Sequence, residues 1–212
     1  MKIVSIVPIK LNNERLPGKN TKMLGDRPLI DYILQTLAAC DDLSERYVYC
    51  SDNRIKEYLP RDVRFLERPK VLDEPTSNFT QIFDCFKNSV DADIYVYAHA
   101  TAPFITLESV NECINKVESG EFDSAFTAIK IQDFLWLDEK PLNFDATNLP
   151  RSQDLKPIYR ESSGVYVFTK EVFEKYRRRI GVKPYIKEIS YKESIDINVP
   201  EDFELAELFL HK

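Results

Sequence analysis

The stretch "IVSIVPIKLNNERLPGKN", residues 3–20, changes character halfway along. Residues 3–9 are almost all apolar and mostly β-branched, which is typical of a parallel strand covered on both faces. Residues 10–20 are polar and basic and contain a Pro-Gly pair. A buried strand that ends in such a loop predicts an α/β sheet with an anion-binding turn at its carboxyl edge, where backbone N–H groups and cations meet. A solvated basic loop is the alternative.

Strand and helix patterns alternate over the first 130 residues. Apolar strand patterns occupy residues 46–52, 63–69, 92–104 and 122–131, and helical apolar stripes occupy residues 29–38, 76–90 and 107–117. This alternation predicts an α/β sandwich with a largely parallel sheet. Ligands of such sheets bind at the carboxyl ends of the strands.

The alternation stops at residues 132–160. This segment mixes aromatic, proline and charged residues and shows neither the apolar spacing of a helix nor that of a strand. This segment predicts an extended excursion or hairpin arm. Beyond it we expect a strand over 162–170, a helix after it, and a strand end at 194–198 followed by a terminal helix. At 212 residues, a single domain over 1–212 is the expected organisation.

Composition and charge limit which partners and which cellular location we expect for this protein. The chain carries 29 basic and 35 acidic residues, a net charge of −6, which argues against a nucleic-acid partner. No apolar run approaches the ~20 residues of a membrane span, so no membrane partner is expected. The N-terminus enters a strand pattern without an export leader. The four cysteines are widely spaced without a C-x-x-C pair, so reduced core thiols and a cytoplasmic location are predicted.

The loop reverses this charge locally. Between residues 10 and 22, four cations stand against the single acid Glu14: Lys10, Arg15, Lys19 and Lys22. The segment contains neither the GxxxxGK[ST] motif nor GxGxxG. Any phosphate bound here is therefore held by a different kind of loop.

Six stretches, taken in order, resemble the acylneuraminate cytidylyltransferase (CMP-sugar-acid synthetase) family. They are "VPIKLNNERLPGKNTKMLGDRPLI" (7–30), "YCSD" (49–52), "RPKVLDEPTS" (68–77), "YAHATAPF" (97–104), "SQDLKPIYRESSGVYVF" (152–168) and "SIDINVPEDFELAE" (194–207). Together they extend over almost the whole chain, and their common order makes the resemblance specific.

The resemblance implies a three-layer α/β/α nucleotidyltransferase (Rossmann-like) sandwich with a mostly parallel mixed sheet and a dimerisation excursion at 132–160. It implies transfer of CMP from CTP to an acidic sugar, such as N-acetylneuraminate or another nonulosonic acid, for cell-surface polysaccharide or glycoconjugate synthesis. It further implies release of pyrophosphate, Mg²⁺ as the cofactor, and a homodimer. One alternative is a different acceptor, either 3-deoxy-manno-octulosonate or a phosphonate. The other is a nucleotide-binding module that has lost catalysis.

The resemblance also assigns nucleotide-binding residues. Lys10 and Lys19 are the implied catalytic cations, and the nucleotide-binding set is Lys10, Asn12, Asn13, Arg15, Lys19, Asn20, Ser51 and Arg68. These residue types suit in-line attack on the α-phosphorus, because charge builds on the leaving pyrophosphate and catalysis consists of positioning and neutralisation. For Ser51, capping of a helix, with Asp52, is the alternative.

The implied metal ligands are Asp196 and Asn198, in "DIN" where the family has D-I-D. Strand alternation would place both side chains on one side, and their oxygens suit Mg²⁺. The alternative is a polar strand end that caps the last helix through Asn198.

The implied acceptor-binding residues are His99, Thr101, Gln153 and Tyr166. His99 replaces a family glutamine, and Ser162-Ser163-Gly164 replaces N-G-A, so the acceptor can differ from N-acetylneuraminate. A satisfied histidine and a core tyrosine are the alternatives for His99 and Tyr166. In the family Arg151 and Gln153 fall in a segment that crosses to the partner subunit, and Phe134, Leu135 and Trp136 would be dimer contacts.

Overall fold

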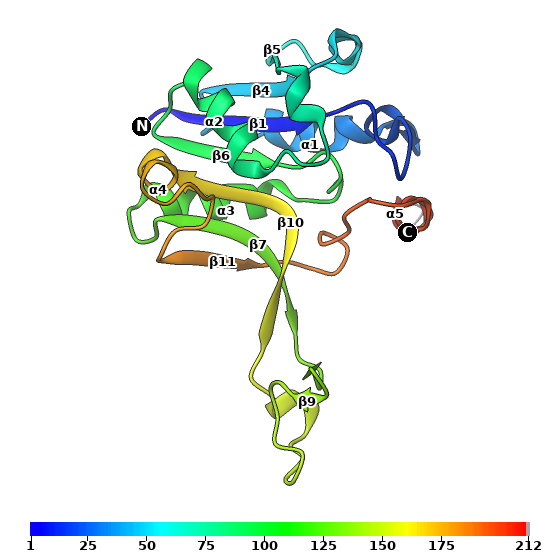
Figure 1. The fold of residues 1–212 in the computed structure, drawn as a ribbon, viewed down its shortest axis with the longest axis vertical. Helices are drawn as coiled ribbons and strands as arrows, with labels where there is room; N and C mark the ends of the chain where they lie inside the picture. The colour runs from blue at the N-terminus through cyan, green and yellow to red at the C-terminus, as the bar shows by residue number, and fades with distance from the viewer. Residues whose placement is uncertain (211–212) are drawn as a thin grey trace.

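The computed structural model describes residues 1–210 and places seven strands in one sheet (Figure 1). Their order across the sheet is β11-β7-β10-β6-β1-β4-β5. The strands are β1 (Ile3–Ile9), β4 (Glu45–Cys50), β5 (Val63–Glu67), β6 (Ile94–Ala98), β7 (Ser124–Ile131), β10 (Ile158–Thr169) and β11 (Pro184–Glu188). Neighbours pair in parallel, except that β10 runs antiparallel to both β6 and β7. The predicted α/β fold with a mostly parallel mixed sheet is confirmed.

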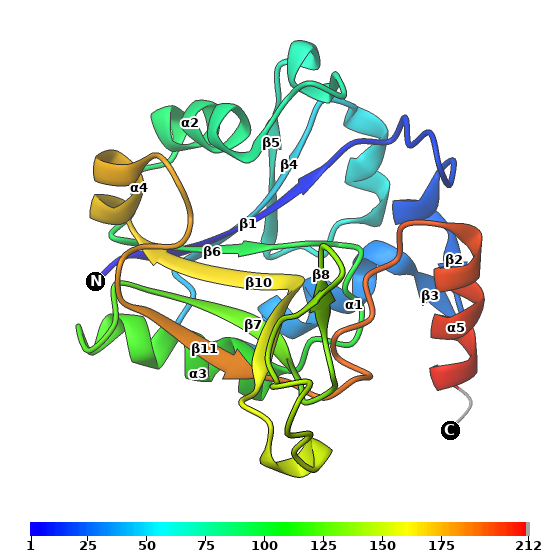
Figure 2. The same ribbon diagram turned by 60° about the horizontal axis from the view of Figure 1, so that its bottom comes forward.

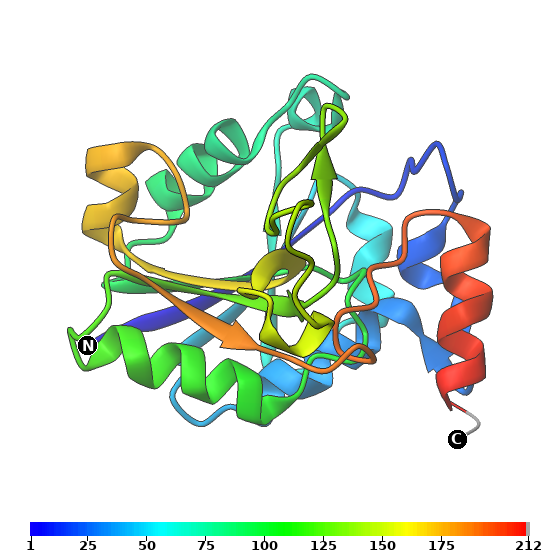
Figure 3. The ribbon, with the colours of Figure 1, turned by 90° about the horizontal axis from the view of Figure 1, so that it is seen from below.

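Helices cover both faces of this sheet, as the view from below shows (Figure 3). Helices α1 (Leu29–Ala38) and α3 (Leu107–Glu118) pack on one face, and α2 (Phe79–Ser89) and α4 (Lys170–Tyr176) pack on the other. Helix α5 (Pro200–Leu210) lies beyond the sheet edge, where it packs on the segment that follows β1. The short elements are η1 (Lys19–Thr21), η2 (Asn53–Tyr58), η3 (Lys70–Asp73), η4 (Ser152–Asp154) and the small hairpins β2 (Met23–Leu24)–β3 (Arg27–Pro28) and β8 (Trp136–Leu137)–β9 (Lys140–Pro141).

The unbroken apolar run of β1 follows from this covering. Ile3 and Val7 join the core under α1 and α3, whereas Val4 and Ile6 join the core under α2 and α4. A strand buried on both faces has no solvent-facing positions, so its sequence shows no alternation.

Helix α2 begins three residues later than its apolar stripe suggests. The Asn78 side chain accepts a hydrogen bond from the Gln81 amide at 3.1 Å, and the Gln81 side chain accepts one from the Asn78 amide at 2.9 Å. This reciprocal capping box satisfies two otherwise unpaired backbone donors and fixes the start of the helix.

Three sequence expectations differ from the structure. Strand β6 ends at Ala98 instead of residue 104, because the chain turns with the Ala102 amide donating to the His99 carbonyl at 3.2 Å. Strand β11 was not predicted. The predicted strand end at 194–198 was wrong: this segment is a loop, anchored where the Ile197 amide donates to the Thr101 carbonyl at 2.8 Å.

Residues 132–157, which we call the arm, leave the sheet between β7 and β10 and project from the body (Figures 1 and 2). Near the hairpin β8–β9, the Phe144 ring packs edge-on against Phe134 at 4.9 Å and against Trp136 at 5.4 Å. Trp136 still exposes 60% of its surface. The role of the arm at a dimer interface stays a prediction.

Two further expectations concern cysteines and hydropathy. All four thiols are free; Cys40, Cys50 and Cys113 are buried and Cys85 is half-buried. Over residues 1–210, none of the helices combines the length and the apolar character needed to cross a bilayer.

We expect Phe83→Ala to lower the free energy of unfolding by about 3–5 kcal/mol, because it opens a cavity in the aromatic core under α2. The Phe83 ring is fully buried and packs edge-on against Phe173 at 4.6 Å and Tyr95 at 4.8 Å. Urea unfolding measures the change, with Val71→Ala as the exposed control. A loss equal to that of the control would contradict this account of the core.

Candidate active site

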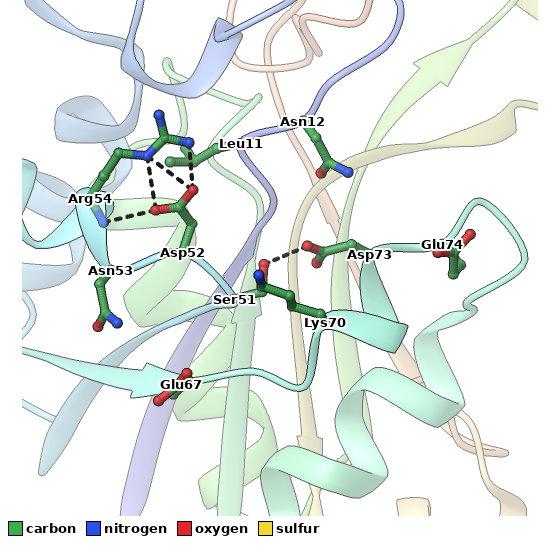
Figure 4. A pocket seen from close by; sticks show the side chains of 10 residues that line it. All are labelled: Leu11, Asn12, Ser51, Asp52, Asn53, Arg54, Glu67, Lys70, Asp73 and Glu74. Carbon is green, nitrogen blue, oxygen red and sulfur yellow. Dashed lines mark hydrogen bonds and ion pairs between the residues drawn. The ribbon is translucent and has the colours of Figure 1, made fainter.

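A large cleft opens at the edge where β1, β4 and β5 end. Its volume is about 730 Å³, and the polar side chains that line it come from the segments after these three strands (Figure 4). The lining residues are Leu11, Asn12, Ser51, Asp52, Asn53, Arg54, Glu67, Lys70, Asp73 and Glu74. The cleft thus lies at the carboxyl ends of parallel strands, as the sequence predicts for a ligand site.

Three smaller cavities continue this cleft along the sheet edge. A cavity of about 250 Å³ shares Asp73 and Glu74 with the cleft and extends to His99. A second cavity of about 250 Å³ shares Lys10 with the first one and contains Lys19. A third, of about 350 Å³, shares Asn198 with the second and is lined by Asp196, Ser162 and Ser163. Because each cavity shares lining residues with its neighbour, the four adjoin one another along this edge, and we refer to them together as the groove.

The basic loop is fixed by bonds to the backbone. Gly18 has φ +66°, a left-handed conformation that favours glycine, and it leads directly into η1. The buried Lys19 ammonium donates to the Ile197 carbonyl at 2.8 Å, and the Asn20 side chain donates to the Lys10 carbonyl at 3.0 Å. Burial lowers the pKa of Lys19, and the nearby Asp196 carboxylate opposes this shift. The loop therefore holds its cations in place before any ligand binds.

Asp73 organises the wall between the cleft and the His99 cavity. Its carboxylate accepts from the Ser51 hydroxyl and forms an ion pair with the buried Arg68. The Lys10 ammonium donates to the Asp73 backbone carbonyl at 3.1 Å. The Arg68 Nε is buried without a partner in the described part of the chain, as is Asn13 Oδ1 in the loop. Buried polar atoms without partners point to a ligand that satisfies them.

Asp73 is the member of this cluster that the sequence analysis missed. It stands inside the quoted stretch at 68–77, directly after Leu72, and its position in a polar segment gave no separate signal. The sequence analysis gave helix capping, by Ser51 with Asp52, as the alternative to nucleotide binding, and the structure gives the cap to Asp52 alone. Asp52 caps η2 by accepting from the Arg54 amide at 3.0 Å, whereas Ser51 binds Asp73.

Asp196 and Asn198 lie together, although not through strand alternation. The Asn198 amide nitrogen donates to Asp196 Oδ2 at 2.8 Å, and Asn198 Oδ1 accepts from Arg15 at 3.1 Å. Asp196 Oδ1 is buried without a partner in residues 1–210. Asp202 caps α5 by accepting from the backbone amides of Asn198 and Val199, so the capping role offered for Asn198 belongs to Asp202.

The residues fit a magnesium ion, although no group of three His, Cys, Asp or Glu side chains suited to a metal occurs within the described residues. Mg²⁺ is usually held by one or two carboxylates together with waters and substrate phosphates. The unpartnered Asp196 Oδ1 supplies such a carboxylate beside the cavity of the loop cations.

His99 faces the groove in a fixed tautomer. Its Nδ1 lies within hydrogen-bond distance of the Ser163 carbonyl, which can only accept, so Nδ1 carries the proton and Nε2 is an acceptor. Burial lowers the pKa of His99; the Ser163 carbonyl opposes the shift and the Arg179 charge adds to it. His99 is therefore neutral at physiological pH.

The other residues predicted to bind the acceptor do not line the four cavities of the groove. Thr101 is half-buried and its carbonyl anchors the 194–198 loop. Tyr166 is buried in the core, and its hydroxyl donates to Glu161 at 2.7 Å, next to the cavity of Asp196. Gln153 lies on the arm in η4, and its carbonyl accepts from Gln132. Within one chain the structure does not bring Gln153 to the groove.

An α/β sheet with a cation-bearing loop at the end of a central strand is an architecture of nucleotide-binding proteins. The family model described as Cytidylyltransferase matches residues 4–211. The chain belongs to the cytidylyltransferase family, which confirms the resemblance found in the sequence.

Curated relatives match at low identity. The N-acylneuraminate cytidylyltransferase of Oncorhynchus mykiss is 24% identical over 215 residues, which cover 97% of this chain and 49% of that protein. The 3-deoxy-manno-octulosonate cytidylyltransferase of Acaryochloris marina is 22% identical over 256 residues, which cover 100% of this chain and 98% of that protein. The chain thus spans about half the length of the N-acylneuraminate relatives that it matches.

Solved structures share the fold. A CMP:2-keto-3-deoxy-manno-octonic acid synthetase in complex with CTP has a TM-score of 0.75 at 15% identity and covers 100% of this chain and 99% of its own. A 4-diphosphocytidyl-2C-methyl-D-erythritol synthase from Anaerococcus prevotii has a TM-score of 0.69 at 15% identity, with 100% and 96% covered.

We expect His99→Gln to make stability less sensitive to acid. The pKa of His99 in the fold lies below its ordinary value of 6.5, so below pH 6.5 the unfolded chain binds the proton more readily and the free energy of unfolding falls. Urea unfolding at about pH 7.5 and 5.5 should show a larger loss for the wild type than for His99→Gln. Equal losses would contradict the depressed pKa.

Proposed function

We propose that this protein transfers CMP from CTP to an acidic sugar, a nonulosonic acid such as N-acetylneuraminate or a relative of it, with release of pyrophosphate. The observation that carries the proposal is the loop of residues 10–20, whose cations lie in the middle of a groove that has a polar cleft at one end and the Asp196 cavity at the other. The cleft suits a nucleoside and the loop cavity suits a triphosphate. The His99 and Asp196 cavities, which adjoin the loop cavity on either side, suit an acceptor.

The triphosphate is assigned to the loop cations. Lys10 and Lys19 both line the central cavity, with Arg15 at its rim. Because the Lys19 ammonium is already desolvated, it loses little hydration when a phosphate binds, and its attraction to developing charge is strong in the less polar surroundings. Asn12 and Asn13 supply amide groups on the same loop.

The nucleoside is assigned to the 730 Å³ cleft, which Ser51 and Asp73 line. Arg68, which pairs with Asp73, lines the adjoining cavity of His99 and holds this wall in place. Asn20, whose side chain holds the Lys10 carbonyl, acts by fixing the loop.

The acceptor is assigned to the cavities of His99 and Asp196. A Mg²⁺ ion held beside the Asp196 cavity would supply charge neutralisation for the phosphates. Asp196 and Asn198 would hold the ion. His99 Nε2 is an acceptor that can orient a sugar hydroxyl, and Ser163 keeps the ring in that tautomer.

We expect pyrophosphate release with CTP, Mg²⁺ and one of a panel of acceptors that includes N-acetylneuraminate, 3-deoxy-manno-octulosonate and a phosphonate. CTP should be preferred over ATP, GTP and UTP. Lys19→Ala should lower kcat at least about 100-fold, because it removes a charge that stabilises the leaving pyrophosphate.

Lys175→Ala, an exposed cation on α4, is the matched control and should retain activity. Turnover by Lys19→Ala at the control rate would remove the loop from the mechanism. CTP binding without turnover over the whole panel would favour a nucleotide-binding module instead.

We also propose that the arm forms a homodimer contact. Its large exposed side chains gather in one projecting segment: Phe134, Trp136, Leu137, Leu142 and Leu149. Exposed apolar groups of this size are typical of surfaces that another protein covers. A second copy that covers the arm would bring Arg151 and Gln153 towards its neighbour's groove.

We expect the wild type to be a dimer in light scattering after gel filtration. The double substitution Trp136→Glu and Leu142→Glu should give a monomer, because it places charge where apolar surface is buried. Leu208→Glu on α5 alters an equally exposed leucine outside the arm and should leave the dimer intact. A monomeric wild type would contradict the assignment.

A further inference from the structure

Arg179 occupies an unusual position in the loop between α4 and β11. Its guanidinium carbon lies 3.5 Å from the centre of the Tyr166 ring, 5.3 Å from that of Phe79 and 5.8 Å from that of Tyr97. These rings come from β10, α2 and β6, so three separate elements hold one cation. The side chain is half-buried.

Arg179 also lacks an anionic partner. Within residues 1–210 it forms no ion pair and no hydrogen bond, whereas the preceding Arg177 pairs with Asp84 at 2.7 Å and Arg178 donates to the Gly181 carbonyl at 3.2 Å. Contact with aromatic faces stabilises the charge. It leaves the five N–H donors of the guanidinium without an acceptor among residues 1–210.

This cation borders the acceptor side of the groove. Tyr97, which Arg179 overlies, lines the cavity of His99, and the His99 ring lies 5.3 Å from Tyr97 and 6.1 Å from Tyr166. On its other side Arg179 lines a surface cavity of about 460 Å³ with Phe79 and Gly181. Arg179 lines this surface cavity and none of the four groove cavities, and the Tyr97 ring is what it shares with the cavity of His99.

Most other cations of the groove are already engaged, and Lys70, which has no ion pair within residues 1–210, lines the cleft assigned to the nucleoside. Arg68 is paired with Asp73, Lys10 donates to the Asp73 carbonyl, and Lys19 lies in the loop assigned to the triphosphate. Arg160 lines the cavity of Asp196, but it is exposed and no contact fixes it. A guanidinium whose carbon lies 3.5 Å from a ring centre is restricted in position, which suits two parallel bonds to a carboxylate.

We propose that Arg179 recognises the carboxylate of the acceptor and so selects acidic sugars. This inference rests on the proposed transfer to a sugar acid. The ring platform fixes the guanidinium plane, and an incoming carboxylate accepts from its free N–H groups.

The test compares each acid acceptor with its own methyl ester, which keeps the sugar and removes the charge. N-acetylneuraminate, 3-deoxy-manno-octulosonate and their methyl esters are titrated calorimetrically into wild type and Arg179→Gln. We expect Arg179→Gln to weaken binding of the acid by about 10- to 100-fold and to leave the ester unchanged. Arg179→Lys keeps the charge but cannot form two parallel hydrogen bonds. Its affinity for the acid should lie between those of the wild type and Arg179→Gln.

Three controls separate recognition from folding. CTP affinity and the melting temperature of Arg179→Gln should match the wild type. Arg177→Gln removes the same charge two residues away and should bind the acid normally, and Arg160→Gln tests the rival cation.

If Arg179→Gln weakened binding of the acid and of the ester equally, its role would be structural and the proposal would be overturned. The proposal would also be overturned if Arg160→Gln, and not Arg179→Gln, weakened binding of the acid. Unchanged acid binding by Arg179→Gln would overturn it while the transfer activity stands. Failure of the wild type to bind either acid, with CTP still bound, would instead overturn the acceptor class and this inference with it.

Discussion

One hydrogen bond joins the two ends of the chain at the edge of the sheet. The Lys19 ammonium, in the loop after β1, donates to the Ile197 carbonyl, in the loop before α5. Burying this ammonium is costly, and a fixed backbone acceptor offsets part of that cost. The bond sets the basic loop beside Asp196 and Asn198, so the groove depends on a contact between residues 178 positions apart.

The surrounding groove follows the same principle of placing charge before a ligand arrives. Arg68 and Ser51 are bonded to Asp73, the loop backbone is held by Asn20, and Ser163 fixes the His99 tautomer. Catalysis of phosphoryl transfer depends mainly on positioning and neutralisation, so a site with prearranged cations has little reorganisation left to do. In a protein of net charge −6, this local concentration of cations also makes one edge of the sheet favourable for an anion, which is the basis of the proposed nucleotide site.

The residues proposed to bind the acceptor are held differently from those proposed to bind the nucleotide. The loop cations are bonded to backbone carbonyls, whereas Arg179 lies on aromatic faces and His99 stands edge-on to Tyr97. Aromatic contacts fix the orientation of these groups without using their hydrogen-bonding capacity. In the proposed arrangement, the Arg179 N–H groups and His99 Nε2 remain for the acceptor and would distinguish one acceptor from another.

The sequence by itself determined the α/β fold and the basic loop at the end of the first strand, because hydrophobic periodicity and local charge are properties of neighbouring residues. It also indicated the family, through six short stretches in order. Only the tertiary structure decided how Asp73 joins Ser51 to Arg68, that residues 195–198 form a loop, and that Arg179 lies on Tyr166. The physical reason is that these contacts connect residues whose proximity is created by strand order and helix packing, which no local pattern records.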